Sequence, residues 1–556
     1  MKPRLIGLSH LALSLLLVAL LTASSWNSSP SYDEPEHMTC GYTQVQQGSF
    51  WINPFHPPLL KQLSGYALSL QAWNRPEREW AYCGKIASIQ SFCFGMGNDL
   101  QAMIRTARAP MIALAGLFLL LYFQVLQRQL GSAESLTAGL ALALSPTFLA
   151  NAPLVHTDMG AMAACFVGVL LYLWGSTPRH PRRWLLVTGC WLGVAMLCKY
   201  SCAVLAIFYG LWRLPGRNFK SHVGQWLALV TLAVLVIWAQ YALLPVPQRY
   251  QRSYNNLMHR NQEEPINRLI LETQHVPGVR HLSWFLSGFY AQGHHLMQGH
   301  MGRSSYVRGR YFRGGRWDYF PTLWLSKECL ATLLLVLGGG VGALLYRREA
   351  PNFVRASAAF AALYLGIALL GNLNLGIRHT LPAYPFILAV VAWAWWNPLA
   401  RVLGRPLVEG LLALWLLGCS LAVSLAFPGY LSYFNELVGG KDGGPAIALD
   451  SNLDWGMDLY RLKLHMDEQG LAMVHLFYYG SNDPFAVLGP RYKVFGGEPL
   501  PPGQYLAVSL SYYHQAQLAL QGSGIYPDHV RPSTLRWLLG LPEVCRIGDT
   551  LLLLKT

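Results

Sequence analysis

The sequence predicts an α-helical polytopic membrane protein, with about eleven transmembrane helices and a small C-terminal α/β domain outside the membrane. Of its 556 residues, 53% are hydrophobic and 12% are charged, which is about half the charged fraction of a typical soluble protein. Hydrophobic residues also gather in runs of helical length, such as residues 226–244 and 407–427. Because a bilayer offers the backbone no hydrogen-bond partners, such runs predict spanning helices. Alternation with a period of two residues is absent, which disfavours a membrane β-barrel.

The apolar runs place all the predicted spans in the first 427 residues. They lie near residues 5–23, 110–127, 136–150, 159–175, 184–197, 201–213, 225–244, 328–346, 356–371, 380–396 and 406–427. The first run follows two basic residues, so a signal peptide is the alternative interpretation. Its apolar core is long for a signal and no A-x-A site follows, so we expect the helix to be retained. Cleavage would leave the orientation of the other spans unchanged.

The distribution of basic residues predicts which loops face the cytoplasm. With the N-terminus inside, the inner segments hold Lys2, Arg4, Arg128, Arg179, Arg182, Arg183, Arg213, Arg217, Lys220, Arg347, Arg348, Arg355, Arg401 and Arg405. The short outer loops hold only Lys199 and Arg378. The fifth and sixth spans could instead be one helix interrupted at Lys199. That reading would move most downstream basic residues outside, so a helical hairpin is favoured.

This orientation divides the chain into a transmembrane module (1–427) and an extracytoplasmic domain (428–556). The module has two large outer loops, residues 24–109 and 245–327. The second loop is rich in arginine, which suggests an anionic partner at the membrane surface, either lipid headgroups or a phosphate. Cys83 and Cys93 lie on the oxidising side and are the first candidates for a disulfide. No Cys or His spacing typical of a metal site occurs.

Acidic residues at the outer rim are the first candidates for chemistry. Asp33 and Glu34 lie in the segment Tyr32–His37, shortly after the first span. A carboxylate held there can act as a general base while a lipid-anchored substrate stays embedded; the alternative is a solvated acidic loop. Asp158 lies at the edge of a span, where a charge is costly and therefore suggests function. Its alternative role is to cap the following helix.

The basic candidates on the same face would bind a phosphate. They are Lys61, Lys199, Lys327, Arg378 and His379. Fixed cations stabilise negative charge that develops on a leaving group, and arginine offers a phosphate two parallel hydrogen bonds. Lys199 and Arg378 are also the exceptions to the positive-inside bias, which favours a functional role. The alternative for each is that the side chain reaches toward lipid headgroups.

Short motifs follow one another along the predicted outer face. They are Asp33-Glu34, Gly41-Tyr42, His56–Lys61, His156–Asp158, Leu197–Ser201, Gly315–Pro321 with Lys327, Gly376–Pro385, Tyr430–Glu436 and Asp450–Leu459. In this order they resemble the lipid-carrier-dependent glycosyltransferases of the GT-C superfamily, of the glycosyltransferase family 39 type. Protein O-mannosyltransferases and the aminoarabinose transferases of lipid A belong there. Cys198, Asp318 and Met457 depart from the family pattern, which leaves fine specificity open.

The resemblance implies an extracytoplasmic, inverting transfer of a hexosyl or pentosyl group from a polyprenyl-phosphate-linked sugar. Asp33 is then expected to be the base, with Glu34 or Asp158 orienting the acceptor or the sugar. Arg378, Lys61, Lys199, Lys327 and His379 would bind the carrier phosphate. Residues expected to bind the acceptor or the sugar are His37, Tyr42, His56, Asp454 and Trp455. No cofactor is required, although a divalent metal stays open.

We expect the protein in a bacterial inner membrane, in contact with membrane lipids and with an acceptor that is a protein, a lipid or a glycan. No nucleic-acid partner is expected. Two other classes of protein fit the same topology. A transporter or flippase for a lipid-linked sugar would need charged groups near the bilayer midplane and paired broken helices. A non-catalytic envelope assembly protein would use the C-terminal domain to bind a partner.

Overall fold

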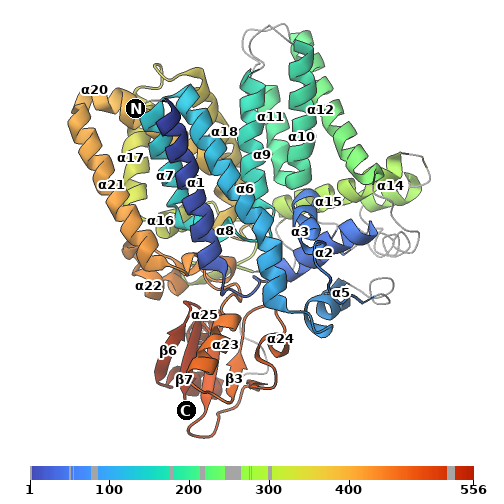
Figure 1. Ribbon diagram of the computed structural model, residues 1–556, viewed down its shortest axis with the longest axis vertical. Helices are drawn as coiled ribbons and strands as arrows, with labels where there is room; N and C mark the ends of the chain where they lie inside the picture. Colours follow the sequence, from blue (N-terminus) through green and yellow to red (C-terminus); the bar gives the residue numbers. More distant parts are fainter. Residues whose placement is uncertain are drawn as a thin grey trace.

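The computed structural model describes residues 3–48, 52–53, 56–76, 85–174, 181–212, 219–243, 265–273, 276, 278–298, 304–521 and 532–556. Cys83, and with it the predicted Cys83–Cys93 disulfide, lies outside these residues. Figure 1 shows a large helical part and a smaller part with a β-sheet at one end. The predicted fold class, a helical membrane protein with a small C-terminal α/β region, is therefore confirmed.

The helical part contains apolar helices of very different length. They are α1 (Pro3–Ser25), α6 (Leu100–Gln129), α7 (Ser132–Ala143), α8 (Pro146–Asn151), α9 (Asp158–Trp174), α10 (Pro181–Cys198), α11 (Val204–Trp212), α12 (Phe219–Ala242), α17 (Leu330–Leu345), α18 (Asn352–Leu370), α19 (Tyr384–Ala394), α20 (Ala400–Leu403) and α21 (Arg405–Ala426). Local sequence sets several ends. Asp99 caps α6 by accepting hydrogen bonds from two backbone N–H groups. Gly131, with a φ of 135°, separates α6 from α7.

Six helices in the described part of the chain are long and apolar enough to cross a bilayer. The bent pair α16 (Tyr319–Lys327) and α17 would make a seventh span if it counts as one. Other predicted spans correspond to shorter apolar helices, such as α9. The predicted number of about eleven is therefore not confirmed, because length alone does not decide how these shorter helices sit in a bilayer.

The predicted hairpin at Lys199 is present. Helix α9 runs antiparallel to α10, since Trp191 donates to the Ala164 carbonyl and the earlier Trp184 donates to the later Leu171 carbonyl. Helix α9 runs parallel to α11, since Gly168 lies against Leu205 and Tyr172 donates to the Tyr209 carbonyl at 2.6 Å. Consequently α10 and α11 are antiparallel, and the chain reverses at Lys199, whose backbone is extended (φ −157°, ψ 139°).

The elements of the two predicted outer loops lie at the same end of the bundle as the sheet (Figure 1). They are α2 (Glu34–Gln47), α3 (Leu59–Leu68), α5 (Lys85–Ile89), η1 (Gln90–Gly95), α14 (Pro265–Thr273), α15 (Val279–Gln298), β1 (Ser305–Val307), β2 (Arg310–Phe312) and α16. Helices α2 and α3 cross closely at two glycines. A Cβ on Gly41 would lie 2.0 Å from the Lys61 carbonyl oxygen, so this crossing requires glycine.

The C-terminal part contains a five-stranded mixed sheet in the order β4-β3-β5-β7-β6. The strands are β3 (Val474–Phe477), β4 (Tyr492–Val494), β5 (Tyr505–Ser509), β6 (Glu543–Ile547) and β7 (Leu551–Lys555). Strand β3 is parallel to β4 and β5, whereas β7 is antiparallel to β5 and β6. The accompanying helices are α22 (Gly440–Ile447), α23 (Leu459–Glu468), α24 (Pro484–Leu488), α25 (Leu510–Leu520) and α26 (Pro532–Leu539).

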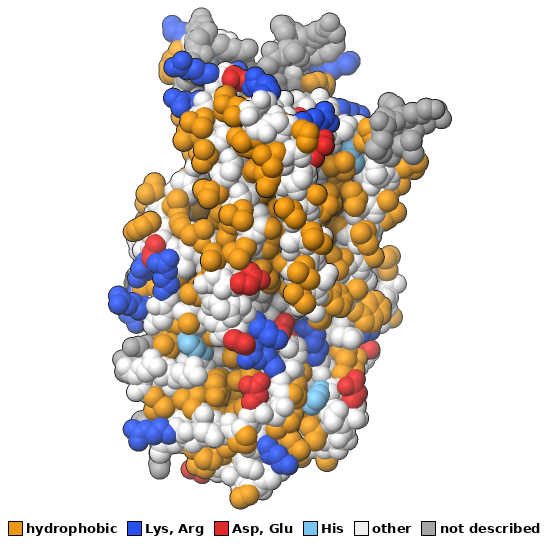
Figure 2. All heavy atoms as spheres, turned by 90° about the vertical axis from the view of Figure 1, so that its left-hand side faces the viewer, with side chains coloured by type: hydrophobic (Ala, Val, Ile, Leu, Met, Phe, Trp, Pro, Cys, Tyr) orange, Lys and Arg blue, Asp and Glu red, His pale blue; other side chains and the backbone are white. Residues whose placement is uncertain are grey.

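Two surfaces of different character follow from this arrangement. Figure 2 shows that hydrophobic side chains cover much of the helical region of one face, while charged side chains gather at the top and around the C-terminal part below. Exposed leucines on α21, such as Leu414, Leu417 and Leu425, belong to this apolar region. An apolar exterior of this kind suits lipid rather than water. The candidate residues lie where the helical bundle meets the C-terminal part.

Candidate active site

Four charged side chains from four segments meet at this junction. The Lys199 ammonium lies 2.5 Å from Asp158 Oδ1. Arg378 lies near two carboxylates. Its Nε is 3.6 Å from Asp158 Oδ2, and its Nη2 is 3.9 Å from Asp33 Oδ2. His379 Nδ1 is 3.4 Å from the Lys199 ammonium. The structure therefore brings Asp33, Asp158, Lys199, Arg378 and His379 together, as the sequence predicts.

Each of these side chains is positioned by the end of a helix. Asp33 precedes α2, Asp158 begins α9, and Lys199 lies in the break between α10 and the short 3₁₀ helix η2 (Tyr200–Ala203). Arg378 lies in another 3₁₀ helix, η3 (Ile377–Ala383), which leads into α19. Helix ends leave backbone groups without intrahelical partners, and they let a side chain point along the bundle axis.

The Arg378 guanidinium packs against a tryptophan ring, but one of its nitrogen atoms lacks a hydrogen-bond partner among the described residues. It is 9% exposed, and its central carbon lies 4.2 Å from the centre of the Trp455 ring. Among the described residues, Nη1 of Arg378 has no hydrogen-bond partner, and neither has Nε2 of His379. Buried donors normally find partners, so these two nitrogen atoms on adjacent residues have hydrogen-bonding capacity left for a ligand. The charge of arginine and its donor geometry favour an anion there.

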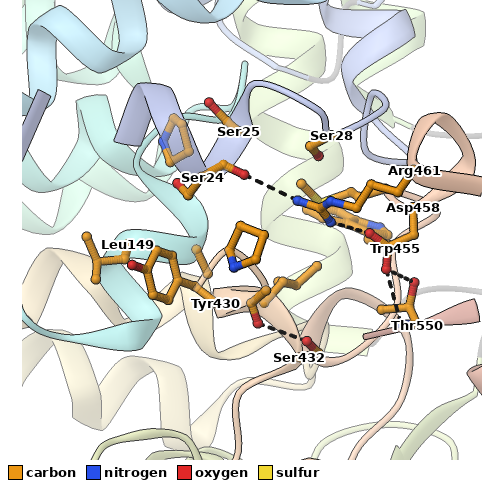
Figure 3. Close-up of a pocket in the computed structure, with 16 residues that line it drawn as sticks. Ser24, Ser25, Ser28, Leu149, Tyr430, Ser432, Trp455, Asp458, Arg461 and Thr550 are labelled. Atoms are coloured by element: carbon orange, nitrogen blue, oxygen red, sulfur yellow. Dashed lines mark hydrogen bonds and ion pairs between the residues drawn. The ribbon is translucent and has the colours of Figure 1, made fainter. Parts of the chain in front are cut away.

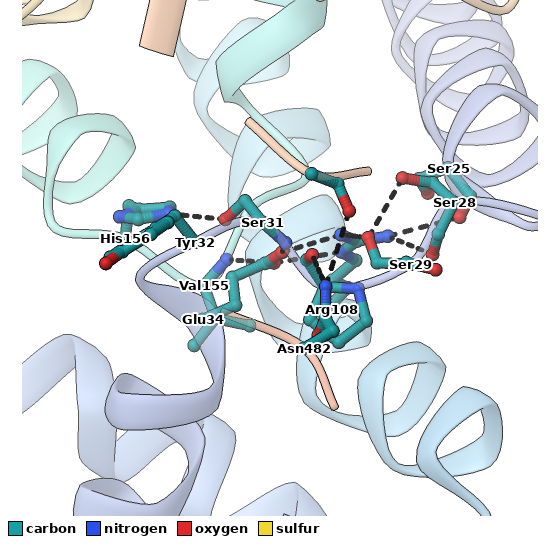
Figure 4. A network of polar contacts seen from close by, with 12 residues as sticks. Ser25, Ser28, Ser29, Ser31, Tyr32, Glu34, Arg108, Val155, His156 and Asn482 are labelled. Carbon is teal, nitrogen blue, oxygen red and sulfur yellow. Dashed lines mark hydrogen bonds and ion pairs between the residues drawn. The ribbon is translucent and has the colours of Figure 1, made fainter. Parts of the chain in front are cut away.

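Glu34 has a different environment from its neighbour Asp33. It is fully buried and receives hydrogen bonds from Arg108 Nε at 2.9 Å and Nη2 at 2.6 Å. The backbone N–H groups of Ser31 and Val155 donate to the same carboxylate. Figure 4 shows this network around Arg108 and Glu34. Burial alone would raise the pKa of Glu34, but the charge and hydrogen bonds of Arg108, together with His156 and the Ser31 N–H, hold that pKa below its ordinary value.

This network corrects one expectation. Both Glu34 oxygens are occupied by hydrogen bonds from protein groups, so the carboxylate offers no free face for orienting an acceptor or a sugar. Arg108 also donates to the carbonyls of Ser25, Ser28 and Ser29. The pair therefore fixes the outer end of α1 to α6 and α2, and it supports the loop that carries Asp33.

Three histidines, two from residues 24–109 and one from the segment between α8 and α9, pack against one another near Asp33. The ring of His37 lies 5.2 Å from that of His56 and 5.1 Å from that of His156. His156 stacks on Trp455 at 4.9 Å and contacts Ser31 Oγ at 3.1 Å. Burial lowers the pKa of His56 and of His156, although Asp33 and Glu34 act in the opposite direction on His156. Both imidazoles are therefore neutral at pH 7.

Lys61 and Tyr42, two of the remaining candidates, contact other residues of the segment 24–109. Lys61 is buried, and its ammonium donates to the carbonyls of Asn53 at 2.9 Å and His56 at 2.7 Å. Its charge further lowers the pKa of His56. Tyr42 stacks on Phe92 at 4.8 Å within the apolar contact between α2 and η1, so its ring belongs to the core of the first outer loop.

Lys327 and Asp454 are scaffold residues in this structure. The Lys327 ammonium donates to three carbonyls, those of Leu431 at 2.8 Å, Tyr433 at 2.9 Å and Asn452 at 2.6 Å. All three of its hydrogens are thus used, which contradicts the expected phosphate contact. Asp454 is fully buried and accepts a hydrogen bond from the backbone N–H of Gly456 at 3.2 Å. Burial raises the pKa of Asp454 to about 7.

Trp455 lies between this cluster and a small cavity. The cavity has a volume of about 40 Å³ and lies between the end of α1, helix α8 and the C-terminal part (Figure 3). Asp458 and Arg461 line it, and they form an ion pair with each other. These two charges are already paired, whereas Arg378, which lies over the Trp455 ring, keeps a nitrogen without a hydrogen-bond partner among the described residues. No group of three or more metal-ligating side chains in the described ranges is arranged to hold a metal ion.

The sequence analysis did not identify two of the residues that shape the site. Arg108 directly precedes the long apolar stretch of α6, and it is buried, so it requires a partner of opposite charge. His156 was visible only as part of a motif with Asp158. Its ring position against Trp455 depends on a contact between segments about 300 residues apart in sequence, which no local pattern reveals.

Comparison with known proteins finds one family model. Residues 92–240, about a quarter of the chain, match the model described as dolichyl-phosphate-mannose-protein mannosyltransferase, and this segment contains Asp158 and Lys199. The match agrees with the resemblance to GT-C glycosyltransferases seen in the sequence. No curated protein matches this chain in a search by sequence.

Solved structures similar to this protein share little sequence with it. ArnT from Cupriavidus metallidurans, bound to undecaprenyl phosphate, is 14% identical over 98% of this chain and 97% of its own, with a TM-score of 0.46. The Archaeoglobus fulgidus oligosaccharyltransferase is 12% identical over 92% and 71%, with a TM-score of 0.43. The S. cerevisiae Pmt1–Pmt2 protein O-mannosyltransferase complex, bound to the sugar donor, is 17% identical over 44% and 33%, with a TM-score of 0.31. All three scores lie below 0.5, so the assignment rests on the matched segment and the motifs.

Proposed function

We propose that this protein transfers a sugar from a polyprenyl-phosphate carrier to an acceptor hydroxyl or amine on the extracytoplasmic face of a bacterial inner membrane. One observation carries the proposal. Arg378 presents an unpartnered guanidinium nitrogen next to the carboxylate of Asp33, at the end of the bundle where the membrane module meets the C-terminal part. An anion-binding donor beside a base is what such a transfer needs.

The proposed reaction is a single displacement with inversion. The acceptor atom attacks C1 of the sugar, the bond between C1 and the phosphate oxygen breaks, and the acceptor proton passes to Asp33. The bonding electrons leave with the carrier, which gains one negative charge. Arg378 and His379 donate hydrogen bonds to this phosphate, and Lys199 adds its positive charge. Asp158 contacts both Lys199 and Arg378 and therefore acts as a positioning residue.

The geometry disfavours a transporter for the same substrate. A transporter needs charged groups near the middle of the bilayer, exposed in turn to either side. Here the charged cluster lies at helix ends, against the C-terminal part, and Trp455 of that part contacts Arg378. A domain that packs onto the anion-binding arginine suits an enzyme whose acceptor arrives from outside.

The proposal is tested by following the carrier. Full-length protein in lipid nanodiscs is incubated with undecaprenyl-phosphate sugars extracted from the native host, together with a host envelope extract as acceptor. We expect release of undecaprenyl phosphate by the wild type, and about 100-fold to 10,000-fold slower release by Asp33→Asn. The matched control is Asp442→Asn, an exposed carboxylate paired with Arg546, which should act as wild type. Equal release by Asp33→Asn would exclude Asp33 as the base, and no release by the wild type would refute the proposal.

A further inference from the structure

A further carboxylate reaches the site from the C-terminal part. Asp450 begins the short 3₁₀ helix η7 (Asp450–Asn452), and its side chain is exposed. One of its oxygen atoms accepts a hydrogen bond from the Tyr479 hydroxyl at 2.7 Å. A Cβ on Gly376 would lie 2.7 Å from Ser451 Oγ and 3.2 Å from Arg378 Nη1. The residue after Asp450 therefore lies beside the Arg378 guanidinium.

The backbone that carries Asp450 is rigidly bound to the segment that carries Arg378. Ser451 Oγ donates to the Leu375 carbonyl at 2.5 Å, and the Ile377 N–H donates to Asn452 Oδ1 at 2.9 Å. Asp450 itself has a φ of +56°, which few residues other than glycine adopt. Neighbouring contacts must hold such a conformation in place, and they fix the direction of the carboxylate.

Tyr479, which is bonded to this carboxylate, belongs to a group of aromatic rings. Tyr479 lies 6.1 Å from Tyr32, which is 38% exposed, and 5.7 Å from Tyr512. Tyr512 stacks on Phe477 at 4.4 Å, so the group is anchored on strand β3. Ser481 Oγ donates to the Tyr32 carbonyl at 2.5 Å, which ties the first outer loop to the C-terminal part. A partly exposed tyrosine surface therefore adjoins an exposed hydrogen-bond acceptor.

This combination has the chemistry of a sugar-binding surface. Tyrosine rings offer an apolar face together with a polar edge, and a carboxylate accepts short, strong hydrogen bonds from hydroxyl groups. We propose that Asp450, Tyr479 and Tyr32 form a carbohydrate-binding subsite at the mouth of the Asp33–Arg378 site. The subsite rests on the proposed function, since it would hold either the sugar of the donor or a sugar ring of a glycan acceptor. Asp450 accepts hydrogen bonds from ring hydroxyls, and Tyr32 packs against the apolar face of the ring.

The test measures sugar binding without turnover. Saturation-transfer NMR on full-length protein in detergent would use free glucose, galactose, mannose, N-acetylglucosamine and arabinose as probes. We expect at least one sugar to bind the wild type, and Asp450→Asn to weaken that binding by about tenfold or more. Asn adopts a positive φ as readily as Asp, so the variant should fold. Tyr479→Phe, which removes only the hydroxyl bonded to Asp450, should weaken binding as well, and the control Asp442→Asn should not.

Two carriers then separate the two sources of the sugar. If undecaprenyl phosphate mannose displaces the free sugar and plain undecaprenyl phosphate does not, the subsite holds the sugar of the donor. If the free sugar stays bound beside the loaded carrier, the subsite holds the acceptor. Absence of sugar binding by the wild type, or unchanged binding by both variants, overturns the subsite. Sugar binding by a wild type that binds neither carrier would instead refute the proposed function and leave the subsite in place.

Discussion

Asp33 and Glu34 are neighbours in sequence with opposite environments, and substitution should separate their roles. Glu34 is fully buried and Arg108 is 1% exposed, with two hydrogen bonds between them. Arg108→Met leaves a buried carboxylate without its counter-charge, and Glu34→Gln leaves a buried guanidinium. Breaking a buried ion pair from one side costs about 3–5 kcal/mol in the free energy of unfolding. Asp33→Asn changes a partly exposed side chain and should cost less than about 0.5 kcal/mol.

The double variant Glu34→Gln/Arg108→Met makes the prediction sharper. With both charges removed, no uncompensated charge is buried, so the double variant should be more stable than either single variant. The sum of the two single costs should exceed the cost of the double variant by about 3 kcal/mol or more. The carbonyls of Ser25, Ser28 and Ser29 lose their donor in any variant without Arg108. Part of the lost stability therefore stays lost.

The assay is denaturant titration of the purified protein in detergent micelles, followed by tryptophan fluorescence. Because the folded-state pKa of Glu34 lies below its ordinary value near 4.5, its stabilising contribution is present above about pH 4.5. It is lost as the pH falls through the folded-state pKa, and this acid loss should be absent from the double variant. Single-variant costs that simply add, or an Arg108→Met protein as stable as the wild type, would refute the reasoning. Activity loss in Glu34→Gln at unchanged stability would return Glu34 to the catalytic group.

Three further predictions concern Arg378, Lys327 and Asp454. Arg378→Gln should weaken undecaprenyl phosphate binding about 100-fold and Arg378→Lys about tenfold, because lysine keeps the charge but loses the second donor. Isothermal titration calorimetry measures this binding, with a substitution of the exposed Arg405, Arg405→Gln, as control. If Arg378→Lys binds as tightly as the wild type, Arg378 does not form paired hydrogen bonds with the phosphate. Lys327→Met should lower the free energy of unfolding by about 2–4 kcal/mol, since three carbonyls lose their donor. If the variant is as stable as the wild type but binds the carrier more weakly, Lys327 contacts the phosphate after all. The pKa of Asp454 is about 7 in the folded protein, above its ordinary value, so the free energy of unfolding should fall as the pH rises from about 4 to about 7. The unfolding temperature of Asp454→Asn should not show this pH dependence. An unchanged pH dependence in the variant would contradict the raised pKa of Asp454.

The sequence predicted which residues lie at the same end of the bundle, because the direction of each helix depends on a whole segment and not on single residues. The hairpin at Lys199 follows from the charge bias of the loops, and it puts Lys199, Asp158 and Arg378 at one end of the bundle. Once the ends of α9, α10 and η3 lie at one level, opposite charges within reach pair with one another. The number of spans was harder to predict, because short helices such as α11 satisfy no length rule.

The roles of individual motif residues were less predictable. Lys327 and Asp454 lie within motifs of the expected family, but a motif does not say whether a residue contacts substrate or holds the scaffold. That distinction depends on partners far along the chain, such as the Leu431 carbonyl for Lys327. Glu34 and Asp33 illustrate the limit most clearly. The two residues are consecutive in the chain, yet Glu34 lies against the buried Arg108 of α6, whereas the Asp33 side chain is partly exposed beside Arg378.

Charge balance at the site gives a last test of the assignment of Asp33. Asp33 and Asp158 carry two formal negative charges, which Lys199 and Arg378 cancel. In the proposed transfer the carrier phosphate gains one negative charge while Asp33 gains a proton, so the total charge in the site does not change. Asp33→Asn removes one negative charge before any transfer. It should therefore bind undecaprenyl phosphate at least as tightly as the wild type, while turning over slowly. Weaker binding by Asp33→Asn would mean that Asp33 acts by positioning Arg378, and the base would have to be sought among the other carboxylates.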